Sequence, residues 1–288
     1  IRVVAVTGVQ TCALPIWKVR YVGDAVAIVA ATSEKAALKA LKLIEVEYEL
    51  LDPVLNMEDS MKEGSPVIHD EEDCSGLFDK SRNIAAHFEM EIGDVEGTLN
   101  GCDYVITRTY HLDTQLHAAL EPHNAVTYLD PAGRLIVVTS TQVPFHCRRI
   151  LSRILNKPIS EIRVIKPRIG GGFGGKQSII AEPYAAIVTL KTGRPARIIY
   201  TREEVSMASN IRHEMKYDIT VGADGNGRIK AISMHGLSNT GAYGEHCLTT
   251  FMVSGSKTLP LYNKVDAVRF GGDVVYTNLP PAGAYRGY

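Results

Sequence analysis

Hydrophobic and polar positions along this chain follow two different periods, and the changes between them outline a mixed α and β protein. Tyr21–Ala31 is dense in Val, Ile and Ala, as a buried strand is. Ser33 then offers an N-cap, and apolar residues at helical spacing follow over Ala37–Ile44. Glu45–Leu50 alternates charged and apolar residues, which predicts a half-exposed strand. The start of the chain therefore indicates a compact α/β unit.

Strand-like segments dominate the chain further on, with one clear helical stripe among them. The stripe runs from Val143 to Ile154. Turn residues at Pro131–Arg134 and Asp224–Gly227 predict two hairpins. The predicted strands are His87–Ile92, Asp103–Leu112, Ala125–Asp130, Leu135–Thr141, Ile162–Lys166, Tyr217–Val221 and Ile229–Met234. Together with the start of the chain, this pattern predicts an α+β protein.

A polar stretch that begins with Asp70–Asp73 and runs to Asn83 interrupts these patterns. It is acidic and lacks periodicity, so it is interpreted as a linker between domains. Consecutive side chains on an extended chain point to opposite faces, so the four carboxylates are interpreted as a solvated loop, not a metal site.

Glycine is concentrated in one segment, where five glycines surround Phe173 and Lys176 closes the run from Gly170. A predicted strand precedes this glycine loop, and Gln177–Leu190 is predicted to be a helix. Such loops let main-chain N–H groups approach an anionic or oxygen-rich ligand at a helix N-terminus. The loop is therefore a candidate binding site.

Three interpretations of the glycine loop compete on spacing alone. Gly170, Gly175 and Lys176 match the phosphate-loop pattern, but Gln177 stands where Ser or Thr would hold magnesium. The loop also satisfies the weak dinucleotide pattern GxGxxG, although the acidic residues at Glu203 come too late for it. The third interpretation is a structural turn, which needs one or two glycines rather than five.

Composition and charge exclude several classes of protein. The chain has 288 residues and a net charge of −1, which gives no electrostatic basis for binding nucleic acid. No apolar run approaches the ~20 residues that span a bilayer. The 5 cysteines are scattered without a CxxC pair, which argues against iron–sulfur or structural zinc sites. A reduced cytoplasmic protein is expected.

The first residues receive a separate interpretation. Val6–Ile16 resembles an in-frame translation of a sequencing-adapter oligonucleotide, so residues 1–17 are expected to be an assembly artefact. Cys12 and Trp17 therefore carry no functional weight.

Three motifs occur together in the order of one known family. They are Ser140-Thr141-Gln142, the glycine loop, and Thr277-Asn278-Leu279-Pro280-Pro281 leading into Ala284-Tyr285-Arg286-Gly287-Tyr288. With them, the chain from about Val19 resembles the molybdenum-cofactor subunit of the xanthine dehydrogenase/aldehyde oxidase family. The resemblance implies a hammerhead-like α/β domain over residues 18–69, a linker over 70–84, and the first part of a molybdopterin-binding α+β domain over 85–288.

The resemblance also implies roles for single residues. Gln142 matches the glutamine that hydrogen-bonds an oxo ligand of the metal. The backbone of Gly172, Phe173 and Gly174 matches the part of the loop that lines the metal's oxygen ligands, with the Phe173 ring orienting planar substrates. Arg286 matches an arginine that approaches the cofactor. No residue of the chain is expected to bind the metal directly.

Two positions bear on the substrate. Xanthine-oxidising members carry glutamate where this chain has Gln177, so xanthine is not assigned. Copper-containing carbon monoxide dehydrogenases carry cysteine where Gly287 stands, so no copper bridge is expected. Gln177 and Phe173 are expected in the substrate pocket, and Glu121 is expected to line it. His111, His117 and His123 are interpreted as pocket-wall or core residues.

The implied reaction is hydroxylation of a purine, another N-heterocycle or an aldehyde with water as the oxygen source. The general-base glutamate of the family is expected beyond Tyr288, so the chain is expected to be a fragment without a catalytic residue. The cofactor would be molybdenum–molybdopterin, with the cytosine dinucleotide form left open. Iron–sulfur clusters and FAD are expected on partner subunits.

Two alternatives to the hydroxylase remain open from the sequence. One is a nucleotide- or phosphate-binding module that uses the loop from Gly170 to Lys176. The other is a non-catalytic structural subunit, against which the presence of Gln142, Phe173 and Arg286 counts.

Overall fold

The computed structural model describes residues 9–13, 18–72 and 74–287, in which helices and three separate sheets confirm the α+β class. The chain forms two compact units. The first unit comprises the described residues of Ile1–Asp52 together with His117–Ser209. The second unit comprises Pro53–Leu116 and the described residues of Asn210–Tyr288. Each unit is thus built from two separate stretches of chain.

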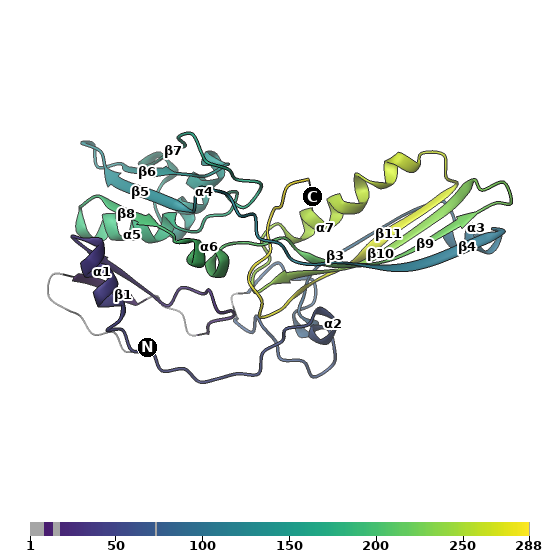
Figure 1. Ribbon diagram of the computed structural model, residues 1–288, viewed down its shortest axis with the longest axis horizontal. Helices are drawn as coiled ribbons and strands as arrows, with labels where there is room; N and C mark the ends of the chain where they lie inside the picture. The colour runs from purple at the N-terminus through teal and green to yellow at the C-terminus, as the bar shows by residue number, and fades with distance from the viewer. Residues whose placement is uncertain (1–8, 14–17, 73, 288) are drawn as a thin grey trace. The chain divides into compact units, whose positions relative to one another are not determined.

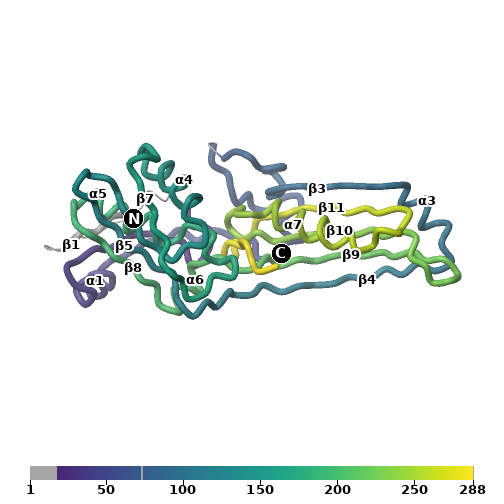
Figure 2. Tube along the Cα trace, turned by 90° about the horizontal axis from the view of Figure 1, so that it is seen from above, coloured from purple at the N-terminus to yellow at the C-terminus, as the bar shows by residue number. Residues whose placement is uncertain are grey.

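The second unit is built on a five-stranded sheet. Its strands are β3 (Ile84–Ile92), β4 (Tyr104–Leu112), β9 (Glu214–Ala223), β10 (Ile229–Gly241) and β11 (Ala267–Tyr276). They lie in the order β3-β11-β10-β9-β4, which Figure 2 shows as five long neighbouring traces. Only β10 and β11 run parallel. The predicted hairpin at Asp224–Gly227 is confirmed, because it joins the antiparallel strands β9 and β10.

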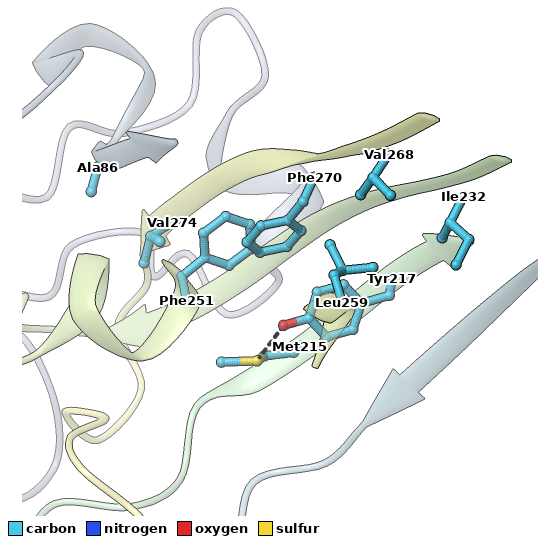
Figure 3. Close-up of a cluster of buried hydrophobic side chains, with 9 residues drawn as sticks. All are labelled: Ala86, Met215, Tyr217, Ile232, Phe251, Leu259, Val268, Phe270 and Val274. Atoms are coloured by element: carbon cyan, nitrogen blue, oxygen red, sulfur yellow. Dashed lines mark hydrogen bonds between the residues drawn. The ribbon is translucent and has the colours of Figure 1, made fainter. Parts of the chain in front are cut away.

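Short helices complete the second unit, and α7 runs along one face of the sheet (Figure 1). Its helices are α2 (Met57–Ser60), η1 (Lys80–Arg82), α3 (Val95–Asn100), α7 (Cys247–Ser256) and η3 (Leu259–Tyr262). The core lies where α7 meets the sheet. Phe251 of α7 stacks on Phe270 of β11 with ring centroids 5.2 Å apart, and the Tyr217 ring of β9 lies nearly parallel to Phe251 at 6.5 Å (Figure 3). Buried aromatic area of this kind stabilises the unit.

The first unit has a four-stranded sheet in the order β7-β6-β5-β8, with two helices packed on it. Its strands are β5 (Asn124–Leu129), β6 (Leu135–Thr139), β7 (Ile162–Ile165) and β8 (Ala196–Ile199). Its helices are α4 (Pro144–Ile154), η2 (Ile159–Glu161), α5 (Glu182–Thr192) and α6 (Arg202–Ala208). The predicted hairpin at Pro131–Arg134 is confirmed by the pairing of β5 with β6, and the helix predicted from Val143 to Ile154 is confirmed as α4. Cys147 and Leu151 of α4 are fully buried against the sheet.

The same unit contains a small α/β element at the start of the chain. Strand β1 (Val9–Ala13) pairs antiparallel with β2 (Ala27–Ala31), and α1 (Glu34–Leu41) follows. The N-cap prediction is confirmed, because Ser33 Oγ accepts a hydrogen bond from Ala36 N–H. The prediction of a strand from Tyr21 was too long at its start.

Two further expectations were wrong. Glu45–Leu50 forms no strand, because no other strand of the described chain lies beside it to accept its hydrogen bonds. The helix after the glycine loop begins at Glu182, not at Gln177. The loop is therefore separated from the helix N-terminus by a non-helical segment. None of the described helices is long and apolar enough to cross a bilayer.

Candidate binding loop

The glycine loop connects β7 to α5 in the first unit, and side chains from other segments hold it in place. Gln142 follows β6, and its main chain pairs with the end of the loop: Gln142 N–H donates to Lys176 O at 2.8 Å. Gln142 Oε1 in turn accepts hydrogen bonds from Gly174 N–H at 2.9 Å and Lys176 N–H at 3.2 Å. The loop is thus folded around one glutamine side chain.

These contacts fix which end of the Gln142 amide points toward the loop. Two N–H donors meet the same side-chain atom, so that atom must be the oxygen. The Nε2 group, with its two N–H bonds, makes no hydrogen bond to any described residue. Gln142 is only partly buried, so Nε2 remains a neutral donor available to a bound ligand.

Close approach of side chains explains several of the glycines. A Cβ on Gly172 would lie 2.6 Å from Gln142 Cδ, and one on Gly175 would lie 2.7 Å from His117 Cγ. The loop therefore accommodates Gln142 and His117 only because these positions lack side chains.

Phe173 is the one non-glycine residue of the loop's centre, and its backbone is left-handed with φ 55°. This conformation costs an aromatic residue roughly 1–3 kcal/mol and is often found at ligand sites. The Phe173 side chain is 43% exposed. The loop therefore presents an aromatic ring on its surface instead of packing it in the core.

The Glu121 side chain contacts both the first and the last residue of the loop. Its Oε2 accepts hydrogen bonds from Gly170 N–H at 2.7 Å and from Lys176 Nζ at 2.8 Å, while Oε1 accepts from Asn124 Nδ2 at 3.1 Å. Burial alone would raise the pKa of Glu121. The hydrogen bonds from Lys176, Gly170 and Asn124, together with the lysine charge, outweigh it and lower the pKa. The Glu121 carboxylate is therefore ionised and joins Gly170 to Lys176.

The function of Lys176 could not be seen in the sequence. Its side chain is only 2% exposed, and its ammonium group is paired with Glu121. A phosphate-loop lysine must reach the phosphates of its ligand, whereas this one points into the unit. The pairing of Lys176 with a residue 55 positions earlier was the missing information.

The three histidines around Leu120 do not behave alike. His117 is buried beneath the loop, and burial lowers the pKa of His123 to about 4, with Lys176 adding to the effect. These two agree with the interpretation as core or wall residues. His111 is not a core residue, because it lies on β4 of the second unit with 47% of its side chain exposed and is paired with Glu214.

The remaining predicted residues take different positions. Gln177 is half-buried, and its N–H donates to Gly174 O at 3.0 Å. Arg286 belongs to the second unit, where its guanidinium lies over the Tyr285 ring at 5.2 Å and donates to the Tyr285 hydroxyl. Tyr285 donates in turn to Gln115 Oε1 at 2.9 Å. The loop residues and Gln142 thus meet in one unit, and Arg286 is held in the other.

Models of two protein families match the chain. The molybdopterin cofactor-binding domain matches residues 77–288, and the a/b hammerhead domain of aldehyde oxidase and xanthine dehydrogenase matches residues 5–52. The chain therefore belongs to the molybdopterin cofactor-binding family, as its motifs predicted. The expected artefact at residues 1–17 stays a prediction; residues 1–8 and 14–17 lie outside the described residues.

Individual relatives agree with this assignment. The chain is 40% identical over 298 aligned residues to the probable hypoxanthine oxidase XdhD of Escherichia coli strain K12, covering 94% of this chain and 31% of that protein. It is 34% identical to the nicotinate dehydrogenase large molybdopterin subunit of Eubacterium barkeri, covering 94% of this chain and 61% of the relative. The chain thus spans about a third of the length of XdhD.

Solved structures confirm the fold. The aldehyde oxidoreductase of Desulfovibrio gigas superposes with a TM-score of 0.84 at 22% identity, over 93% of this chain and 29% of that one. Quinoline 2-oxidoreductase from Pseudomonas putida superposes with a TM-score of 0.81 at 27% identity, over 93% of this chain and 34% of that one.

Proposed function

We propose that the chain is part of a molybdenum hydroxylase of the xanthine dehydrogenase type. Such an enzyme hydroxylates a purine, another N-heterocycle or an aldehyde, with water as the oxygen source. The observation that carries this proposal is Gln142, whose oxygen is held by two loop amides so that its Nε2 is left as a neutral donor. A neutral donor suits an oxygen ligand of a metal, because it stabilises the oxygen without adding a charge.

The loop geometry fits molybdenum–molybdopterin. Within the described residues, the N–H groups of Gly171 and Gly172 have no acceptor, and Gly172 is buried. Buried amides of this kind require a partner, and oxygen atoms of a bound group would supply one. When bound, this cofactor would transfer oxygen from water and accept electrons. Gly172, Phe173 and Gly174 would shape the loop around it, and Arg286 is proposed as a further cofactor-binding residue.

Three residues are proposed to face the substrate side. The exposed Phe173 ring would orient a planar substrate, and Gln177 would hydrogen-bond a heterocycle without attracting a charge. Glu121 was expected to line the substrate pocket. Because its carboxylate is occupied by Gly170, Lys176 and Asn124, we propose that it acts mainly by positioning the loop.

Further properties follow from the family and are proposals here. The pterin would be present with or without the cytosine dinucleotide extension, and iron–sulfur clusters and FAD would be held by partner subunits. The assembly would be cytoplasmic. The chain would comprise a hammerhead-like domain over residues 18–69, a linker over 70–84 and a cofactor domain over 85–288.

The proposal is tested with a change that alters one donor and little else. Gln142→Glu keeps an oxygen that can accept from Gly174 and Lys176 but replaces the Nε2 donor with a second oxygen. The complete gene would be expressed with its neighbours in a host that makes molybdopterin. Loss of one donor to a charged reaction centre lowers turnover by about 100- to 1,000-fold. Molybdenum content, turnover of hypoxanthine, nicotinate and aldehydes, and incorporation of labelled oxygen from water would be measured.

Gln177→Glu is the matched control, because the chemical change is identical. It should alter the preference among substrates while it leaves turnover of a neutral aldehyde near the wild-type value. Wild-type turnover in Gln142→Glu would refute the role of its amide. A wild-type protein without molybdenum that binds nucleotides tightly would support the phosphate-binding alternative, and one that binds neither would support a structural subunit.

A further inference from the structure

A second candidate site lies in the second unit, whereas the glycine loop belongs to the first. His69, Glu71 and Cys74 each direct a donor atom toward the others: a ring nitrogen, a carboxylate oxygen and a sulfur, all within 4.8 Å of one another. In the part of the chain that the structure describes, this is the one place where three or more such side chains converge. The three residues follow the spacing H-x-E-x-x-C and include no CxxC pair, which is the usual sequence pattern of a zinc site.

The orientation of the His69 ring is defined by its surroundings. Its Nε2 lies 2.7 Å from Ala242 O, which can only accept, so Nε2 carries the proton. The ring also packs edge-on against Tyr276 at 4.5 Å and near Tyr243 at 5.8 Å. In the neutral ring, the lone pair is therefore on Nδ1. A carbonyl acceptor behind a histidine is the usual arrangement for a histidine that binds a metal through its other nitrogen.

His69 Nδ1 lies near the Glu71 carboxylate. Glu71 Oε2 lies 3.7 Å from Nδ1, and this oxygen is buried from solvent. Cys74 N–H donates to Glu71 O at 3.3 Å, and Lys80 Nζ donates to the same carbonyl at 2.7 Å. The Cys74 thiol and the Glu71 carboxylate each lie within 4.8 Å of a His69 ring nitrogen. Three donor atoms this close to one another can bind a single metal ion.

We propose that His69 Nδ1, a Glu71 carboxylate oxygen and Cys74 Sγ bind a divalent transition-metal ion, with zinc as the best match. Zinc takes nitrogen, oxygen and thiolate ligands in a tetrahedral arrangement, and three protein ligands leave one position for water. Calcium and magnesium prefer oxygen ligands only, so a thiolate and an imidazole disfavour them. The ion would link Glu71 and Cys74 to the ends of β10 and β11, through the contacts of His69 with Ala242 and Tyr276.

A protonated His69 is the competing explanation. An imidazolium would pair with Glu71 without a metal, but it would give the Cys74 sulfur no function in the cluster. The two explanations differ in what binds: only the metal site binds Co²⁺ through sulfur, and only the metal site binds one equivalent of Zn²⁺ at neutral pH.

The test is a titration of the metal-free 288-residue chain with Co²⁺ under reducing conditions. Binding through Cys74 produces a sulfur-to-cobalt charge-transfer absorption that saturates at one equivalent and disappears on addition of Zn²⁺. Cys74→Ser should abolish the absorption. Cys102→Ser should retain it, because Cys102 is a half-buried thiol of the same unit that instead donates to Thr98 O.

A second variant addresses the imidazole. His69→Gln should weaken Zn²⁺ binding by more than about 100-fold, since the loss of an outer-shell partner alone costs 10- to 100-fold. Absence of stoichiometric Co²⁺ and Zn²⁺ binding by the wild-type chain would overturn the proposal without depending on the folding of any variant. Retention of the charge-transfer absorption in Cys74→Ser would also overturn it.

Discussion

Replacement of Glu121 by glutamine tests whether the glycine loop is held by a buried charge. Lys176 is 2% exposed and depends on Glu121, whose side chain is 30% exposed. Removing one partner of a fully buried ion pair costs about 3–5 kcal/mol. Because water partly reaches Glu121, we expect Glu121→Gln to lower the free energy of unfolding by about 2–3 kcal/mol. For a unit of this size, that corresponds to a decrease in Tm of roughly 5–12 °C.

The assay is calorimetric unfolding of four variants in a double-mutant cycle. Lys176→Met should cost less than Glu121→Gln, because a solvent-accessible carboxylate tolerates loss of its partner better than a buried ammonium does. The double variant contains no unpaired buried charge and should be more stable than Glu121→Gln. The coupling energy should be at least about 1 kcal/mol.

The matched control is the exposed pair Lys157–Glu161, which joins the same atom types at 3.0 Å. Glu161→Gln should cost no more than about 0.5 kcal/mol, as exposed pairs do. If Glu121→Gln costs no more than Glu161→Gln, or if Lys176→Met does not rescue it, the loop is not held by this charge pair.

The stability that the Glu121–Lys176 pair contributes depends on pH, and the sign of this dependence follows from the lowered pKa of Glu121. Burial opposes ionisation, but the bonds from Lys176, Gly170 and Asn124 dominate, so the folded pKa lies below the unfolded value of about 4.3. The stabilisation is therefore fully present above that pH and is lost as the pH falls through the folded pKa. Glu121→Gln should lack this component.

Two other predictions concern single residues. Gly172→Ala would place a Cβ 2.6 Å from Gln142 Cδ and displace the amide, so we expect turnover of the complete enzyme to fall by about 100-fold. Gly101→Ala should leave turnover unchanged, because φ of Gly101 is −90° and an added Cβ would meet no atom closer than 3.7 Å. Burial lowers the pKa of His213 to about 4, with His246 adding to it. Between about pH 6.5 and 4, the unfolded chain therefore binds more protons than the folded chain does. The free energy of unfolding of the second unit should decrease by roughly 3 kcal/mol as the pH falls through that range. His213→Asn should flatten the profile measured by urea unfolding, and an unchanged profile would contradict the assignment.

Local sequence patterns were sufficient to predict those helices and hairpins that are stabilised by contacts between neighbouring residues. The turn at Pro131–Arg134 defined the β5–β6 hairpin, and the apolar stripe from Val143 predicted α4, because neighbouring residues determine both. The start of α5 could not be predicted in this way. Glu182, at the first turn of the helix, accepts hydrogen bonds from Ile180 N–H and from Thr139 of β6, 43 positions earlier. A long-range contact therefore fixes the segment before the helix.

The same distinction between local and long-range contacts applies to the candidate site. The residues of the site could be predicted, since Gln142 and the loop were identified from their motifs. The hydrogen-bond acceptors of the loop amides could not be predicted, because the pattern placed these amides at a helix N-terminus. In the structure, side-chain oxygens of Gln142 and Glu121 accept from them instead. Such contacts depend on three-dimensional packing and have no signature in a glycine-rich run.

The packing of the loop also explains why a phosphate-binding pattern need not bind phosphate. A phosphate loop requires free amides and a lysine that reaches the ligand. Here Gly170 N–H and Lys176 Nζ both donate to one Glu121 oxygen, so the first and last positions of the pattern are already bound to an anion within the protein. A phosphate would have to displace a carboxylate that is held by three donors. Among the residues that the structure describes, none accepts from the N–H groups of Gly171 and Gly172 or from Gln142 Nε2, so a ligand at these donors would displace no such partner.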